Sequence, residues 1–256
     1  MPQTKLFLSV RGLSHTYHTK NGETPALKDI HFDLFSGEFA AIVGPSGCGK
    51  STLLELISGL IPIEDGSLLY TSSDKAPSIG YMLQKDHLLE HRTIYKNIIL
   101  GLEIQHRLTE KNLEYVQQLM FQYGIADFAS AYPRELSGGM RQRAALIRTL
   151  ALKPEFLLLD EPFSALDYQT RLDVSDDIAK IIRQSGVTTL LVTHDLSEAI
   201  SIADRIIVLG KRPGHIRTIV TIDFGTDKKL SSKEARIHPM FQNYFNQIWK
   251  ELKADE

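Results

Sequence analysis

A chain of 256 residues with 43% hydrophobic and 23% charged residues has the composition of an ordinary globular protein, and it can bury a substantial core. Its formal net charge of −2 gives no electrostatic argument for DNA or RNA, and no apolar run reaches the roughly 18–20 residues that span a bilayer. The N-terminus lacks the apolar core of a signal peptide, and the one cysteine excludes an internal disulfide, which fits a reducing cytosol.

Two alternating stretches near the N-terminus predict a pair of β-strands. Apolar and polar residues alternate in 6–10 and again in 30–34, and Asn21 and Gly22 predict a turn between them. Tyr17 lies in the same region. Its ring has two interpretations that the residues alone leave open: stacking on an adenine face, or packing as a half-buried hairpin aromatic.

A glycine-rich loop follows the next strand. The apolar run 39–43 leads into this loop, and the apolar run 53–57 continues as a helix; the loop reads Gly44-Pro45-Ser46-Gly47-Cys48-Gly49-Lys50-Ser51-Thr52. Strand, glycine-rich loop and helix form the context of a phosphate-binding P-loop. Glycines let backbone N–H groups surround an anion, and the helix N-terminus points its positive end there. Lys50 would reach the β- and γ-phosphates, and the Ser51 hydroxyl would bind Mg²⁺. Cys48 is interpreted as a small filler residue rather than a reactive thiol.

Two short strands and then a helical region come next. Gly59 and Pro62 stop the P-loop helix, and 66–70 and 79–83 are strand candidates, the second ending at Gln84. A glutamine there can offer its amide oxygen to a metal or a water, although most loop glutamines are merely solvated.

From about residue 85 the strand signals vanish and helical spacing replaces them. Leu113, Val116 and Met120 recur at helical intervals behind a candidate N-cap at Thr109, and Gly124 closes the helix. We interpret about 85–132 as an inserted helical subdomain; the alternative is that these helices belong to the same layer as the core.

A second helix start resembles the first in its glycines. Ser137 occupies an N-cap position, and Gly138 and Gly139 fill the first turn, where glycine costs about 0.5–1 kcal/mol each. Close approach of an anion to bare N–H groups is one reason to accept that cost. The alternative is an ordinary capped helix.

Two buried strands end in polar side chains. The apolar run 156–159 ends in Asp160 and Glu161, and the run 187–192 ends near His194. Carboxyl ends of parallel strands form the crevice where α/β proteins bind ligands. Asp160 therefore fits a Mg²⁺ ligand, directly or through water, and Glu161 a group that orients the attacking water. His194 can bond a γ-phosphate oxygen, although a lone histidine is more often packed or solvated.

The C-terminal part predicts a hairpin and a final helix. The apolar segments 206–209 and 216–222 flank a Pro213-Gly214 turn. A polar stretch, 227–233, precedes a helix whose aromatics, Phe241 to Trp249, are interpreted as core or docking contacts.

Together these pieces resemble the ATP-binding subunit of an ABC transporter. The resemblance is carried by Tyr17, the 44–52 loop, Gln84, the Leu-Ser-Gly-Gly-Met stretch 136–140, Asp160-Glu161, the 164–167 segment and His194, and it covers about residues 6–222. It implies an α/β fold: a P-loop NTPase core with a mainly parallel sheet, an N-terminal antiparallel β-subdomain and an inserted α-helical subdomain. The chain is expected to form a single ABC ATPase domain, with 1–84 and 156–222 as core, 85–155 as helical subdomain and 223–256 as polar linker and C-terminal helix.

The resemblance also implies residue roles and partners. ATP and Mg²⁺ are the expected ligands, and two copies of the chain are expected to pair head to tail, so that Ser137, Gly138 and Gly139 of one copy contact the γ-phosphate held by the other. Tyr17 would stack on adenine, Ser51, Gln84 and Asp160 would serve Mg²⁺, and Asp167 would communicate across the dimer. Catalysis would depend on Lys50, Gln84, Glu161 and His194.

Finer motifs are similar to bacterial importer cassettes of the nitrate, sulfonate and taurine group, notably 160–167 and 212–216. That likeness implies integral-membrane permease subunits, an extracellular or periplasmic solute-binding protein acting indirectly, no nucleic-acid partner, and a place on the cytoplasmic face of the membrane. The segment 88–91 departs from the pattern of related cassettes, which leaves permease and substrate open. The competing reading is a soluble ABC ATPase acting on ribosomes or nucleic acid; a P-loop kinase or switch protein conflicts with the 136–140 stretch.

Overall fold

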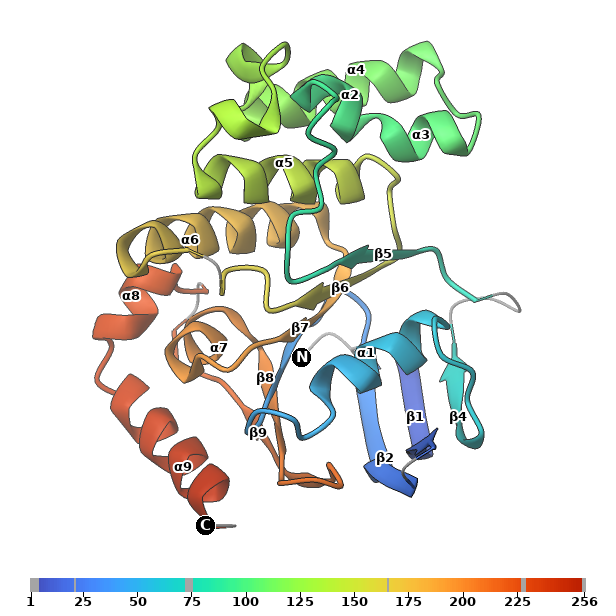
Figure 1. Ribbon diagram of the computed structural model, residues 1–256. Helices are drawn as coiled ribbons and strands as arrows, with labels where there is room; N and C mark the ends of the chain where they lie inside the picture. Colours follow the sequence, from blue (N-terminus) through green and yellow to red (C-terminus); the bar gives the residue numbers. More distant parts are fainter. Residues whose placement is uncertain (1–4, 21, 72–75, 165, 227–228, 255–256) are drawn as a thin grey trace.

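Two β-sheets with one helix between them lie in the lower half of the molecule, beside the C-terminal helices (Figure 1). The computed structural model describes residues 5–20, 22–71, 76–164, 166–226 and 229–254. The predicted turn residue Asn21 and Ala165 of the 164–167 segment lie outside the described residues, as do positions 227 and 228 of the polar stretch.

The larger sheet has six strands in the order β5-β6-β7-β3-β8-β9. They are β3 (Phe39–Val43), β5 (Ile79–Met82), β6 (Phe156–Asp160), β7 (Thr188–Val192), β8 (Arg205–Leu209) and β9 (Ile216–Thr221). The first five run parallel, and β9 pairs antiparallel with β8. Every residue of β3, β6 and β7 is buried, because helices or the second sheet cover both faces, as parallel strands require.

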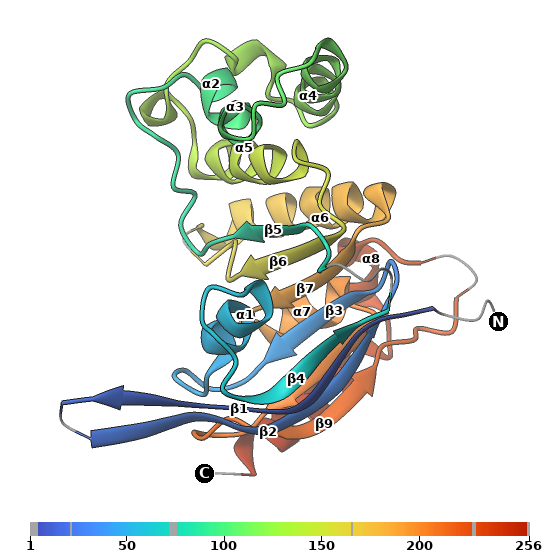
Figure 2. The same cartoon turned by 90° about the vertical axis from the view of Figure 1, so that its right-hand side faces the viewer.

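The smaller sheet is antiparallel and has the order β2-β1-β4. Its strands are β1 (Leu6–Thr19), β2 (Gly22–Phe35) and β4 (Asp65–Tyr70). Helix α1 (Lys50–Ser58) packs between this sheet and the larger one (Figure 2). The predicted hairpin, P-loop strand and helix are confirmed, and Gly59 ends α1 in the left-handed conformation.

Helices lie on the opposite side of the larger sheet, some packed against it and others stacked beyond them. They are α2 (Ile94–Ile98), α3 (Leu100–Ile104), α4 (Glu110–Gln122), α5 (Gly138–Leu150), α6 (Tyr168–Ser185), α7 (Leu196–Ile202), α8 (Ser232–Ile237) and α9 (Phe241–Lys253), with 3₁₀ turns η1 (Ala126–Phe128) and η2 (Pro133–Glu135). Figures 1 and 2 both show α2–α5 at one end, with α6 between them and the sheet.

The predicted cap of α4 is confirmed, since the Thr109 hydroxyl accepts a hydrogen bond from the Asn112 N–H at 3.3 Å. Among the described residues, no helix combines the length and the apolar character that crossing a membrane requires. The predicted α/β fold, with its mainly parallel sheet, antiparallel sheet and helices, is confirmed.

Candidate functional site

The glycines of the 44–49 loop are required by backbone conformation and by crowding. Gly47 and Gly49 have φ angles of +76° and +102°, which side chains disfavour. A Cβ at Gly44 would lie 2.8 Å from Cys48 Sγ, and one at Gly49 would lie 2.7 Å from Leu27 Cδ2. Cys48 is itself buried and packs in the core, so the thiol has the environment of a filler residue, and burial raises its pKa.

Lys50 is the first residue of α1 and folds back over the loop. Its ammonium donates hydrogen bonds to the carbonyls of Gly44 at 2.8 Å and Pro45 at 3.0 Å. Since the side chain is only 7% exposed, these carbonyls hold the charge in place at the helix N-terminus. A buried cation beside unpaired helix N–H groups is a site for a polyanion such as a triphosphate.

Ser51 and Asp160 meet at the edge of the loop. The Ser51 hydroxyl donates to Asp160 Oδ1 at 3.2 Å. Burial raises the pKa of Asp160, and nearby Glu161 and Glu55 add to that effect. A hydroxyl and a partly buried carboxylate, placed together beside a phosphate loop, are the oxygen ligands that Mg²⁺ takes, so these two residues fit the metal.

Glu161 and His194 form a pair across two neighbouring strand ends. His194 Nδ1 lies 2.9 Å from Glu161 Oε2, because β6 and β7 are adjacent and parallel. Glu161 has a φ of +44°, an uncommon conformation for a non-glycine residue. Gln84 follows β5 on the other side of β6, and its amide donates to Ser164 Oγ at 3.3 Å. The three strand-end side chains thus line one edge of the sheet.

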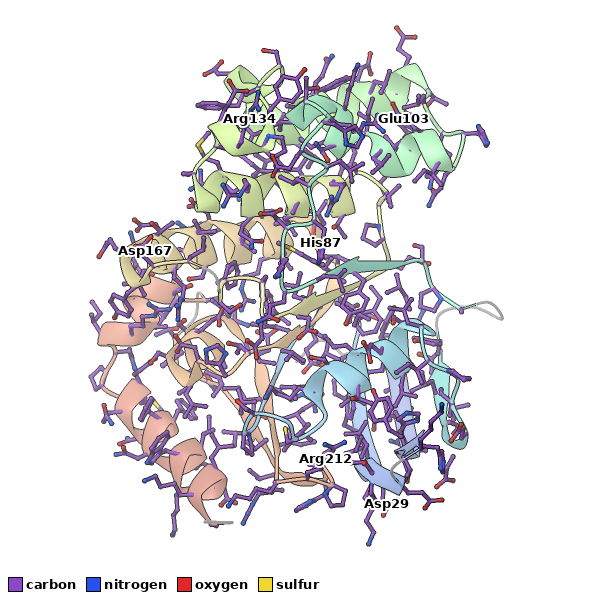
Figure 3. All side chains as sticks on the ribbon, in the orientation of Figure 1. Asp29, His87, Glu103, Arg134, Asp167 and Arg212 are labelled. Carbon is purple, nitrogen blue, oxygen red and sulfur yellow. The ribbon has the colours of Figure 1, made fainter. Side chains whose placement is uncertain are left out.

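A cavity of about 450 Å³ lies between the P-loop and the strand ends, with Gln84 and Glu161 in its wall, whereas Asp160 and His194 lie outside its lining. Its walls are Ala26, Ser46, Gly47, Gly49, Lys50, Ser51, Thr52, Gln84, Glu161 and Arg212. The sequence predicted the Pro213-Gly214 turn. It did not indicate that Ala26 and Arg212 line the cavity. Gly214 packs on the P-loop, where a Cβ would lie 2.0 Å from the Cys48 carbonyl oxygen, and this contact brings Arg212 to the cavity (Figure 3).

Tyr17 lies beside the P-loop helix. Its hydroxyl is 3.1 Å from Thr52 Oγ1, and its ring packs edge-on against His15 with centroids 4.7 Å apart. The side chain is half-buried. It is therefore a half-buried hairpin aromatic that also lies next to the P-loop helix, and its stacking on adenine stays a prediction.

The second glycine helix start lies away from this cavity. Ser137 N-caps α5 and accepts from the Met140 N–H at 3.3 Å, and Asp167 N-caps α6, accepting from the Thr170 N–H at 3.0 Å. Hydrogen bonds from the side chain and the backbone N–H of Thr170 lower the pKa of Asp167. In Figures 1 and 2 α5 is separated from α1 by α6, β5 and β6, and Figure 3 shows Asp167 at the outer start of α6.

Packing within the chain supplies a further reason for the two glycines. A Cβ at Gly139 would lie 2.8 Å from Val174 Cγ2, and one at Gly138 would lie 3.0 Å from Leu166 Cδ2. Helix packing thus demands a small residue at Gly139, whether or not an anion binds there.

The sequence profile of the family described as ABC transporter matches residues 27–164. The chain belongs to the ABC transporter family. The ABC transporter ATP-binding protein YtlC of Bacillus subtilis, whose role is uncharacterised, is 45% identical over 98% of this chain and 97% of its own length.

Importer proteins are among the relatives of this ABC cassette. The aliphatic sulfonates import ATP-binding protein SsuB of Bacillus licheniformis is 36% identical over 97% of this chain and 95% of its own. The nitrate import ATP-binding protein NrtD of Synechocystis is 35% identical over 98% of this chain and 97% of its own length. The solved dimeric post-hydrolysis state of the cassette MJ0796, bound to ADP and Pi, superposes with a TM-score of 0.70 at 28% identity, covering 84% of this chain and 99% of that one. The cassette is an ABC ATPase that binds ATP.

Proposed function

We propose that the cassette is the ATP-hydrolysing subunit of an importer for a small solute, of the nitrate, sulfonate or taurine kind. The importer names of SsuB and NrtD support the transport direction and the solute class. The observation that carries the mechanism is that one chain holds a nucleotide cavity and a separate glycine helix start, which a head-to-tail pair of chains would bring together.

Binding is assigned to the P-loop and its neighbours. The N–H groups of the loop and Lys50 hold the phosphates, and Tyr17 stacks on adenine. Ser51 and Asp160 hold Mg²⁺, with Gln84 contributing directly or through a water. Mg²⁺, when bound, neutralises charge on the β- and γ-phosphates.

Hydrolysis is assigned to the pair at the strand ends. Glu161 orients and polarises the attacking water, and the short contact with His194 fixes the carboxylate for that task. When both ring nitrogens of His194 carry protons, Nδ1–H donates to Glu161 and Nε2–H can donate to a γ-phosphate oxygen. Positioning and charge stabilisation supply the rate enhancement, and no covalent intermediate forms.

Assembly completes the site in this proposal. Ser137, Gly138 and Gly139 of a second copy contact the γ-phosphate, and Asp167 relays the occupancy of one site to the other. The dimeric state of the MJ0796 cassette supports this pairing. Residues 1–84 and 156–222 act as the core, 85–155 as the helical subdomain and 223–256 as linker and C-terminal helix.

Permease subunits are the membrane partners in this proposal, and a solute-binding protein delivers the solute to them. We place the docking surface on residues 85–107, where Leu89 and Ile104 expose apolar side chains beside Leu108. The cassette then lies peripherally on the cytoplasmic face.

The test compares Glu161→Gln with Glu90→Gln, an exposed loop carboxylate that serves as control. Glu161→Gln should retain ATP, lower turnover at least about 100-fold and double in mass with Mg-ATP in light scattering. Adding Ser137→Arg should return the mass to that of one chain. Wild-type turnover in Glu161→Gln, or a dimer indifferent to Ser137→Arg, would contradict the proposal.

A further inference from the structure

The C-terminal helices α8 and α9 pack against the helix that follows His194. Both contact α7, which begins immediately after the segment 193–195 (Figure 1). They are anchored there: Ile248 of α9 is fully buried, Ala235 of α8 is 1% exposed, and the Tyr244 hydroxyl donates to the Asp223 carbonyl at 2.7 Å. Helices α8 and α9 are thus held in place beside the segment that carries His194.

A chain of hydrogen bonds holds the backbone on either side of His194. Asp195 N–H donates to Thr193 Oγ1 at 3.0 Å, and the Thr193 hydroxyl donates to the carboxyl group of Glu198. Asp195 in turn N-caps α7, accepting from the Glu198 N–H at 3.1 Å. Thr193 and Glu198 are 2% and 3% exposed, so this network is rigid and His194 projects from it.

Arginines from two other helices close around Glu198. Arg236 of α8 donates to Ser201 Oγ at 3.5 Å, and Ser201 donates to the Glu198 carbonyl at 2.9 Å. Arg171 of α6 pairs with Asp195 at 3.7 Å. Glu198 Oε1, Arg171 Nε and Arg236 Nε are buried without a hydrogen-bond partner, and Arg171 and Arg236 both act electrostatically on Glu198. Removing Arg236 would therefore leave a buried polar cluster less compensated.

Two aromatic side chains of α9 line a cavity together with His194. This cavity of about 280 Å³ is lined by Arg171, His194, Asp195, Leu196, Phe245 and Trp249. The Phe245 and Trp249 rings stack with centroids 6.1 Å apart and planes at 16°. This stacked pair limits where the half-exposed His194 ring can go.

We propose that α8 and α9 position His194, with Arg236 fixing the 193–195 backbone through Ser201 and the Glu198 cluster, and with Phe245 and Trp249 bounding the imidazole. Arg236, Phe245 and Trp249 are positioning residues, since each acts on the reaction through His194. This inference rests on the proposed role of His194 in hydrolysis, and it gives the C-terminal helices a task in the reaction.

The test is a double-mutant cycle in the full-length chain. Arg236→Gln and Trp249→Ala are measured alone and with His194→Ala, with Ile237→Ala and Gln242→Ala as controls on the exposed faces of α8 and α9. We expect kcat for ATP to fall about tenfold in each positioning variant, with KM nearly unchanged. In the His194→Ala background the same substitutions should change kcat less than about twofold.

Trp249 also supplies a direct signal, because it is the one tryptophan of the sequence. Its fluorescence should change when ATP binds to the wild-type chain and should not change in His194→Ala. This readout separates positioning from a loss of stability, and Trp249→Ala, at a partly exposed site, keeps the test valid if Arg236→Gln does not fold.

Two failures are distinguishable. If His194→Ala hydrolyses ATP at the wild-type rate, the proposed role of His194 is wrong. If His194→Ala is impaired but the positioning variants keep full kcat, or lose as much kcat without His194 as with it, the proposed function stands and this inference is overturned.

Discussion

Hydrogen bonds within the chain fix the positions of side chains around the nucleotide cavity. Arg212 is an example, because its Nε donates to the Pro25 carbonyl at 3.0 Å and this fixes the guanidinium at the cavity wall. A held cation beside a triphosphate contributes about 1–3 kcal/mol to binding when it bonds the anion. Arg212→Ala should therefore weaken ATP binding about tenfold, measured by titration calorimetry. Lys28→Ala, which removes a cation from the neighbouring hollow, should leave the affinity unchanged; equal losses in both variants would rule out a specific contact.

Glu198 is expected to make the stability of the folded chain depend on pH in a definite direction. Burial raises its pKa from 4.5 to about 8, so between these values the folded chain keeps a proton that the unfolded chain has released. Stability must then fall as pH rises through this range. Glu198→Gln removes the titrating group, and its urea midpoint should decline less than that of the wild type between about pH 5 and pH 8. Parallel curves for the two proteins would mean that Glu198 is ionised in the folded chain.

At the scale of secondary-structure elements, the close contact of α5 with α6 depends on the absence of a side chain at Gly139. Gly139→Ala would gain about 1 kcal/mol of helix propensity, but the new methyl would meet Thr170 Cγ2 at 3.1 Å and Val174 Cγ2 at 2.8 Å. Overpacking of this kind costs about 1–3 kcal/mol, so the urea midpoint should fall. Gly138→Ala meets the end of the flexible Leu166 side chain and should be nearly neutral. A stabilised Gly139→Ala protein would refute the packing argument.

The segment after Gln84 connects the cavity to the proposed docking surface. Arg148 of α5 donates to the carbonyls of Asp86 at 2.6 Å and His87 at 2.8 Å, so two hydrogen bonds attach this segment to the helical region. Ile104→Asp places a charge on a side chain that is 69% exposed. We expect it to abolish co-purification with the permease while the isolated cassette keeps its ATPase rate. Phe121→Asp, at a more exposed apolar site on α4, is the control; loss of co-purification only in that variant would move the docking surface there.

Local patterns predicted most of these elements. Strand, loop and helix around Lys50, and the carboxylates after the buried run of β6, are encoded by neighbouring residues, and so are the caps Thr109 and Gly59. Arg212 was not predictable as a cavity wall, because a close contact between Gly214 and Cys48, far apart in sequence, brings it there. The demand for glycine at position 139 likewise comes from α6, which the sequence of α5 does not contain.

At the scale of the whole molecule, the account depends on two chains sharing one triphosphate. The cavity is built by the P-loop and the strand ends, and Ser137 opens a helix on the other side of α6. ATP should therefore hold two copies together with Ser137 of each facing the loop of the other. Because Cys48 is the one cysteine of the chain and is buried, a cysteine introduced at a chosen position would be the one reactive thiol.

The most direct measurement is crosslinking between two differently tagged chains in a Cys48→Ala, Glu161→Gln background, one carrying Ser46→Cys and the other Ser137→Cys. A short bis-maleimide should join the two tagged chains when Mg-ATP is present, and it should not join them with ADP or without nucleotide. Crosslinking that is indifferent to ATP, or its absence while the chains bind ATP as dimers, would contradict a pocket completed by Ser137 of the second copy.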